Sequence, residues 1–237
     1  MKKILLGLLA VVVLAVLGVL GAAMTQPDTL HIERSTTVSA TAADVFPYAD
    51  DFKLFTSWIP WTELDPSQTV AYSDPTSGVG AWYTWEGNNQ VGKGKMSHVS
   101  AEPTKVVHQL EFIEPFASTA SSSITMVDQA DGKVKVTWAY DQDAGMMDKV
   151  MGLFMDMDAM IGADFEKGLA KLGPMVETAA AARIAAEQKA AEEAALAAAA
   201  AAAEEEAAAA AEAPVDGPRV LSPTGTPPRA LGRPGGR

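Results

Sequence analysis

Cysteine is absent from the 237 residues of this chain. Disulfide bonds, thiolate chemistry and cysteine-based zinc sites are therefore excluded, and cysteine usage gives no indication of the compartment. Histidine is scarce, with three residues, and the chain has neither an HExxH motif nor a close pair of histidines on a predicted helix. We therefore predict no metal site and no cofactor.

Basic residues are also fewer than acidic ones. Lys and Arg together number 18 against 30 Asp and Glu, which gives a formal net charge of -12. The segment 25–176 is acidic and contains no basic stripe. Binding of nucleic acid, and docking by charge on an anionic lipid surface, both require clustered basic residues. We therefore expect no nucleic acid partner and no electrostatic attachment to lipid.

One long apolar run is present, at the N-terminus. Ile4–Ala23 contains no charged residue and follows Lys2 and Lys3. A helix of about 20 residues spans about 30 Å, the thickness of the bilayer hydrocarbon. The lysines predict a cytoplasmic N-terminus and a domain on the exported face, which is periplasmic in a double-membrane bacterium. We predict a single-pass anchor in residues 1–24; the alternative is a signal sequence cleaved after Gly21-Ala22-Ala23, which would give a secreted domain.

Turn residues divide the next segment into short strands. Gly78–Gly94 predicts a hairpin, because alternating residues run to Glu86, Gly87-Asn88-Asn89 form a turn, and a strand starts at Val91. Two short helices, Ala42–Asp50 and Asp51–Phe55, are predicted after the first strand, with Ser39 or Thr41 as the N-cap. The other predicted strands are Leu30–Ala40, Thr69–Ser73, Val91–Ser100, Thr104–Ile113, Ser118–Val127 and Lys133–Asp141. Successive strands separated by turns indicate an antiparallel meander.

After Asp143 the apolar period changes from two to three or four residues. From Met147 to Leu172 this spacing predicts an amphipathic helix of about 25–30 residues, which Gly173-Pro174 should break or kink. The apolar side of this helix needs a partner, and the inner face of the meander is available. The sequence therefore predicts an α+β fold in which six to seven antiparallel strands form a curved sheet round one long C-terminal helix.

Beyond the predicted domain, residues 28–176, the composition is biased. Residues 177–213 are almost all Ala and Glu, which favour helix but provide no stripe of larger apolar residues. We predict a solvated helical spacer for this segment. Residues 214–237 are rich in Pro, Gly and Arg and are predicted to be disordered.

Several short motifs resemble a known superfamily. They are Trp58–Trp61 with Asp65-Pro66, the run GVGAWYTWEGN at 78–88, Gly92-x-Gly94-x-Met96, Phe112-x-x-Pro115-Phe116, Val136-Thr137-Trp138 and Phe165-x-x-Gly168-Leu169. Together with the order of the predicted elements, they resemble the SRPBCC superfamily (START-like, helix-grip), in particular a bacterial polyketide cyclase/dehydratase-like branch. The resemblance covers residues 28–175. It implies a hydrophobic cavity between sheet and helix, and it brings no shared catalytic motif.

Strand parity, the helix stripe and the aromatic loop predict the residues that line such a cavity. The candidates are Trp58, Trp61, Trp82, Trp85, Glu86, Met96, Phe112, Phe116, Met126, Trp138, Tyr140, Met151, Phe154 and Met155. Trp82 and Trp85 have opposite parity, so only one of them faces inward in a regular strand. Core packing alone is the alternative role for the apolar candidates, whereas Glu86 and Tyr140 can orient a polar group of a ligand.

Candidates for catalysis are few. His98 and His108 share the inward parity of Met96 and Phe112, and a histidine pair can act as acid and base near neutral pH. The alternative for both is a structural, hydrogen-bonded histidine.

We predict a membrane-tethered, exported domain that binds a hydrophobic small molecule or lipid. Two alternatives stay open: a cyclase or dehydratase-type enzyme with a cavity His, Glu or Tyr as acid or base, and an interaction module without a ligand. No particular protein partner is predicted.

Overall fold

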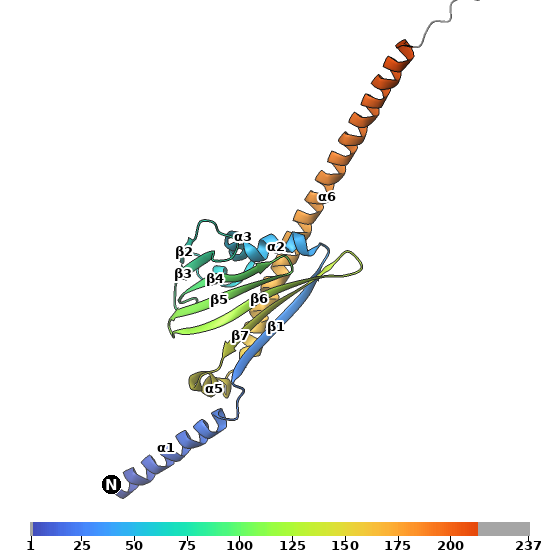
Figure 1. The fold of residues 1–237 in the computed structure, drawn as a ribbon. Helices are drawn as coiled ribbons and strands as arrows, with labels where there is room; N and C mark the ends of the chain where they lie inside the picture. The colour runs from blue at the N-terminus through green and yellow to red at the C-terminus, as the bar shows by residue number, and fades with distance from the viewer. Residues whose placement is uncertain (1, 213–237) are drawn as a thin grey trace, which may run out of the picture. The chain divides into compact units, whose positions relative to one another are not determined.

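The computed structural model describes residues 2–212, so the predicted disordered segment 214–237 lies outside the described residues (Figure 1). The elements are α1 (Lys2–Ala23), β1 (Thr29–Val38), α2 (Ala42–Asp50), α3 (Phe52–Trp58), α4 (Trp61–Leu64), β2 (Thr69–Tyr72), β3 (Trp82–Glu86), β4 (Lys93–Glu102), β5 (Lys105–Glu114), β6 (Ser118–Asp128), β7 (Val134–Asp143), α5 (Met146–Gly152) and α6 (Met157–Glu212). The fold is α+β, as predicted, and the two predicted short helices after the first strand, α2 and α3, are followed by a third, α4.

The strands form one seven-stranded antiparallel sheet in the order β1-β7-β6-β5-β4-β3-β2. This confirms the predicted meander, with β1 added beside β7 in a register that runs from Thr29 opposite Asp143 to Val38 opposite Val134. Because Phe112 pairs with Ser118, the turn between β5 and β6 lies at the same end of the sheet as Thr29. The turn between β6 and β7 lies at the opposite end.

Alternation along the strands buries one face of the sheet, as the sequence predicted. In β4, Gly94 and Met96 are buried while Lys95 between them is partly exposed. In β7, Val136 and Trp138 are buried on the same face. This inner face therefore provides one wall of the core.

The two short helices are set by their caps. Thr41 and Asp44 form a capping box at the start of α2, in which the Thr41 hydroxyl accepts from the Asp44 N–H and the Asp44 carboxylate accepts from the Thr41 N–H. The second helix is Phe52–Trp58 rather than the predicted Asp51–Phe55. Asp51 lies outside it because its side chain accepts the Lys53 N–H at 2.8 Å and so caps the helix.

The single helix predicted from Met147 onward is wrong at its start, because residues 153–156 interrupt it. Asp156 explains the break: its carboxylate accepts the Ala159 N–H at 2.9 Å, the N-cap arrangement that begins α6. Gly152 ends α5 just before it, and glycine has poor helix propensity. The apolar stripe of the sequence is thus shared between two helices.

The break predicted at Gly173-Pro174 does not occur, since α6 continues through Pro174. Proline in a helix costs about 3 kcal/mol, so packing has to outweigh it. Phe165, Leu169 and Leu172 before the proline are buried, and so is Val176 after it. Burial of these side chains on both sides keeps the helix continuous.

Close contact between α6 and the sheet depends on a residue without a side chain. The Phe165 ring stacks on Trp138 with centroids 4.1 Å apart. One turn later, a Cβ on Gly168 would lie 2.8 Å from Cζ3 of Trp138. Glycine at this position lets the helix backbone approach the indole.

Residues up to Ala186 belong to one compact unit, and the residues from Glu187 onward to a second. In the second unit the side chains of residues 187–208 are exposed, and Lys189 lies 3.8 Å from Glu193 on the same helix.

Within residues 2–212, α1 alone has the length and composition to cross a membrane, and a signal sequence would pass the same test.

Candidate functional site

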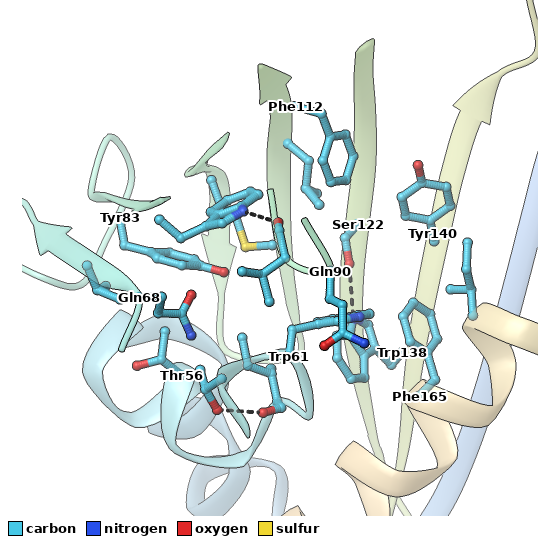
Figure 2. Close-up of a pocket in the computed structure, with 18 residues that line it drawn as sticks. Thr56, Trp61, Gln68, Tyr83, Gln90, Phe112, Ser122, Trp138, Tyr140 and Phe165 are labelled. Atoms are coloured by element: carbon cyan, nitrogen blue, oxygen red, sulfur yellow. Dashed lines mark hydrogen bonds between the residues drawn. The ribbon is translucent and has the colours of Figure 1, made fainter. Parts of the chain in front are cut away.

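A cavity of about 260 Å³ lies between the inner face of the sheet, the α3–α4 segment and the start of α6 (Figure 2). Strands β2 to β7 all contribute to its wall. The lining residues are Thr56, Ile59, Trp61, Thr62, Gln68, Val70, Tyr83, Trp85, Gln90, Val91, Met96, Leu110, Phe112, Ser122, Trp138, Tyr140, Ile161 and Phe165. Most of them are aliphatic or aromatic, so the cavity is suited to an apolar ligand.

Some predicted cavity residues do line this space: Trp61, Trp85, Met96, Phe112, Trp138 and Tyr140. Trp85 fits inside because its partner on β4 is Gly94, where a Cβ would lie 2.3 Å from Cζ2 of the indole. The Trp85 Nε1–H donates to the Val91 carbonyl at 3.0 Å. The hairpin glycine thus makes room for one tryptophan in the cavity wall.

Other predicted residues lie elsewhere. Trp58 and Met126 are fully buried in the core without reaching the cavity. Trp82 lies on the other face of β3, where Lys95 Nζ is 6.0 Å from its ring. Glu86 is exposed and paired with Lys93 at 2.8 Å.

The aromatic loop contributes to both the core and the cavity. The rings of Trp58 and Trp61 contact Trp138 edge-on, at centroid distances of 4.9 and 5.7 Å. Trp138 in turn donates its Nε1–H to the Ser122 hydroxyl at 3.0 Å, and Ser122 donates to the Ala139 carbonyl. The polar atoms behind this part of the wall are therefore satisfied, and the ring faces are left for a ligand.

No charged side chain lines the cavity in the described part of the chain. Its titratable groups are the phenols of Tyr83 and Tyr140. Burial raises the pKa of Tyr83, and burial together with the nearby Asp148 raises the pKa of Tyr140 to about 12. Both phenols are therefore protonated near neutral pH and act as hydrogen-bond donors.

Sequence reasoning missed several polar groups of the wall. The amides of Gln68 and Gln90 point toward the interior (Figure 2) and have no side-chain hydrogen bond to another described residue. Both lie in irregular segments, where no period indicates which side faces inward. Tyr83 is the polar lining residue that the sequence could have revealed, because it lies on the same face of strand β3 as Trp85.

His98 and His108 lie outside the cavity wall, beneath the C-terminal end of α2. The His98 ring stacks on Phe52 with centroids 4.0 Å apart, and its Nε2 lies 2.5 Å from the Asp50 carbonyl. His108 Nε2 lies 3.4 Å from the Ala49 carbonyl. Burial lowers the pKa of both rings, and that of His108 to about 3. This geometry fits neutral, structural histidines that tie the sheet to α2.

The fold and this cavity agree with a family assignment from sequence. The family described as "Polyketide cyclase / dehydrase and lipid transport" matches residues 29–177. The chain belongs to this family. The predicted resemblance to the SRPBCC superfamily and its polyketide cyclase-like branch is thereby confirmed. No curated protein sequence matches the chain.

Several solved structures are similar to this member of the polyketide cyclase / dehydrase and lipid transport family. A protein from Thermobifida fusca is 21% identical with a TM-score of 0.46, over 63% of this chain and 94% of that chain. Protein CV1439 from Chromobacterium violaceum is 13% identical with a TM-score of 0.45, over 64% and 99%. Protein jhp0584 from Helicobacter pylori is 9% identical with a TM-score of 0.48, over 64% and 90%.

A second hollow, of about 750 Å³ and more open to solvent, adjoins the cavity of this family member. The predicted cavity residues Phe116, Met151, Phe154 and Met155 line it. Met151, Phe154 and Met155 do not join the cavity because the break at residues 153–156 separates α5 from α6. Phe116 lies in the β5–β6 turn, at the end of the sheet. Phe112 belongs to both hollows.

The description of the polyketide cyclase / dehydrase and lipid transport family includes both enzymes and carriers. Membership therefore suggests a ligand-binding cavity and leaves the chemistry open. Among residues 2–212, no group of three or more His, Asp or Glu side chains is placed to hold a metal ion.

Proposed function

We propose that this domain binds a neutral, hydrophobic small molecule or lipid in the cavity between sheet and α6, and that α1 tethers it to a membrane with residues 28–176 on the exported side. The observation that carries the proposal is the composition of the wall. Aromatic and aliphatic side chains supply most of it, and every polar lining group is uncharged. Such a wall stabilises apolar surface that leaves water.

The absence of charge among the described lining residues restricts the ligand. An ionised group moved into this space would lose its hydration without gaining a counter-ion, at a cost of several kcal/mol. The volume of about 260 Å³ is close to the lower end of the range for small-molecule pockets, roughly 300–1,000 Å³. A compact ligand, or one acyl chain, therefore fits better than a two-chain lipid.

The ligand also carries a hydrogen-bonding group in this proposal. Gln68 and Gln90 present amides without another side-chain partner, and the Tyr83 hydroxyl remains protonated. Gln68 is half-buried and Gln90 is exposed at the edge of the cavity, whereas Tyr83 is buried. Their side chains can therefore donate to a ketone, ester or hydroxyl group of a ligand that enters the cavity. These three residues would set the orientation of the ligand.

Binding is favoured over acid/base catalysis for a related reason. The histidines proposed as acid and base contact α2 carbonyls rather than the cavity. The phenols that do line the wall have raised pKa values, about 12 for Tyr140, which makes them poor bases near neutral pH. A carrier or receptor needs neither group to ionise.

Filling the cavity tests the binding proposal. Val70 lines the cavity from the edge strand β2, and Val127 is exposed on β6 away from it. The full chain is purified from membranes, and its bound molecules are extracted and quantified by mass spectrometry. We expect about one neutral molecule per wild-type chain, a loss of about tenfold in Val70→Trp, and no loss in Val127→Trp. Equal recovery from all three folded proteins would contradict the proposal.

The tether is tested separately. Ile4–Ala23 should keep the chain in the membrane fraction after an alkaline carbonate wash. Sequencing of the mature N-terminus decides between anchor and cleaved signal sequence. A start near residue 24 would refute tethering without affecting the ligand assay.

A further inference from the structure

Large apolar side chains are exposed at one end of the domain. Phe116 in the β5–β6 turn is 77% exposed, Phe154 after α5 is 75% exposed, and Met147 in α5 is 68% exposed. Met151 is also partly exposed between them in the chain. Soluble surfaces rarely leave such residues grouped in water unless the group binds something.

This end of the domain is the one that α1 enters. β1 begins at Thr29, opposite Asp143 at the end of β7. The Ala144 N–H donates to the Asp28 carbonyl at 2.8 Å, and Lys149 of α5 forms an ion pair with the Asp28 carboxylate. α5 is therefore fixed beside the first residues after the anchor.

The connection to the anchor is short. α1 ends at Ala23 and β1 begins at Thr29. A chain of this length spans at most about 20 Å when fully extended. If α1 crosses a bilayer, the end of the domain with Phe116 and Phe154 cannot move far from the lipid headgroups, whatever angle the domain adopts.

The hollow at this end of the domain shares a lining residue with the ligand cavity. The open hollow of about 750 Å³ is lined by Gln26 and Pro27 of the connection and by Phe116 and Phe154. Phe112 borders both this hollow and the ligand cavity. Its ring meets Trp85 edge-on, with centroids 6.1 Å apart. A hydrophobic molecule in the hollow would therefore meet Phe112 before Trp85, which lines the cavity and not the hollow.

The charges around the hollow indicate how it would meet lipid. Among the described residues, Glu114, Asp148, Asp156 and Asp158 line it, and Lys149 is the only cation beside them. This acidic surface would not be attracted to anionic lipid headgroups. It would instead bind the membrane by inserting its apolar side chains into the interface, as interfacial helices with aromatic and aliphatic faces do.

We propose that Phe116, Met147, Met151 and Phe154 form a membrane-docking surface, which inserts into the interface of the bilayer that holds α1. In this position the ligand passes between bilayer and cavity beside Phe112. The inference rests on the proposed tethering by α1, and it adds a second contact with the same membrane.

Single-cysteine labelling tests the docking surface, because the native chain has no cysteine. Full-length Leu14→Cys, Phe154→Cys and Val127→Cys each receive an environment-sensitive fluorophore and are reconstituted in phosphatidylcholine vesicles. The quencher is a phosphatidylcholine that carries a nitroxide near the headgroup end of its acyl chain. We expect labels at Leu14 and Phe154 to lose about half of their fluorescence, and the label at exposed Val127 to lose almost none.

Other quenching patterns would overturn the docking surface, the tether or both. Quenching at Leu14 without quenching at Phe154 would overturn docking and leave the tether standing. No quenching at either position would overturn both. A Phe154 label that is shielded from aqueous iodide, yet not quenched by the nitroxide lipid, would show that a second copy of the chain covers the surface.

Two further variants separate docking from folding and from ligand binding. The fluorophore is placed at Met151→Cys, and the double substitution Phe116→Asp, Phe154→Asp is added to this labelled chain. The two carboxylates should oppose insertion, so we expect the label to lose most of its quenching by lipid. Both positions are exposed, so the fold should not depend on them. The cavity-filled variant Val70→Trp should still be quenched. Retained quenching in the double variant would overturn the proposal, and so would its loss in Val70→Trp.

Discussion

His98 and His108 lie side by side on adjacent strands, with ring centroids 5.0 Å apart, and neither reaches the ligand cavity. Each has an Nε2 near an α2 carbonyl and an Nδ1 that is buried without a hydrogen-bond partner among the described residues. A protonated ring would be poorly solvated here. The folded state therefore requires both imidazoles to be neutral.

This arrangement predicts that acid weakens the fold. The unfolded chain binds a proton at His108 near pH 6.5, whereas the folded chain keeps this ring neutral to about pH 3. Between these values the unfolded state holds more protons, so stability is complete above pH 6.5 and falls as the pH drops. The expected loss is about 1.4 kcal/mol per pH unit for this group. Urea denaturation at a series of pH values measures it.

The matched variants are His108→Leu and His31→Gln. The first should flatten the pH dependence, because it removes a buried titrating group. The second should leave this acid-linked loss in place, because His31 is exposed and Asp141 raises its pKa rather than lowering it. An unchanged slope in His108→Leu would show that other groups cause the acid sensitivity.

For single residues, the sequence could predict which face of the sheet a side chain occupies, but not which side chains it contacts. Strand parity correctly predicted that Met96 and Trp138 face inward. It could not choose between Trp82 and Trp85, since parity alone gives two equivalent solutions, and the space beside Gly94 decides the matter. Gln68 and Gln90 were not predictable, because residues in irregular segments follow no period.

Among the elements, β1 and α6 are joined by a guanidinium. Arg34 donates from Nε to Glu166 at 3.0 Å and from Nη2 to Asp158 at 2.9 Å. These carboxylates raise the pKa of Arg34, with Asp158 the larger influence. A Cβ on Gly162 would lie 2.1 Å from Nη2, so this glycine lets the side chain lie along the helix.

Arg34→Met should therefore loosen the start of α6. We expect a measurable but modest loss of stability, because Arg34 bridges two carboxylates that are exposed and partly screened. Lys171→Met is the matched control, since its pair with Glu63 is a simple surface ion pair worth less than about 0.5 kcal/mol. Urea denaturation compares the two, and equal losses would contradict a special role for Arg34.

Prediction of the elements failed where local chemistry interrupts a period. The helix stripe continued through Asp156, and nothing in the spacing shows that its carboxylate caps a new helix. Pro174 was expected to break or kink the helix, whereas the helix continues through it because burial of residues such as Val176 outweighs the local cost. The contacts that decided both outcomes depend on tertiary structure or on a cap, which a hydrophobic period does not describe.

For the molecule as a whole, the compact unit extends beyond the family match. The match ends at residue 177, but Ala180 is buried and Arg183 Nε lies 2.7 Å from Asp44. Arg183 is the main reason that the pKa of Asp44 is lowered, to about 2. The first turns of the Ala/Glu-rich segment therefore belong to the folded domain.

Two truncations test this boundary. A chain that ends at Ala186 should melt at the same temperature as the full chain, because it keeps the whole of the first compact unit. A chain that ends at Pro174 loses buried Val176, Ala180 and the Arg183 pair, and should be destabilised by roughly 3 kcal/mol. Thermal unfolding followed by circular dichroism distinguishes them, and equal melting of both truncations would place the boundary before residue 174.

The uncharged wall of the cavity has a consequence for how ligand binding depends on pH. Because no group in the described lining changes its ionisation near neutral pH, uptake of a neutral ligand is not coupled to the gain or release of protons. Occupancy then follows only the supply of ligand and the integrity of the fold. In the proposed role, the domain would therefore keep a neutral ligand as the pH falls, until protonation of the buried histidines unfolds it.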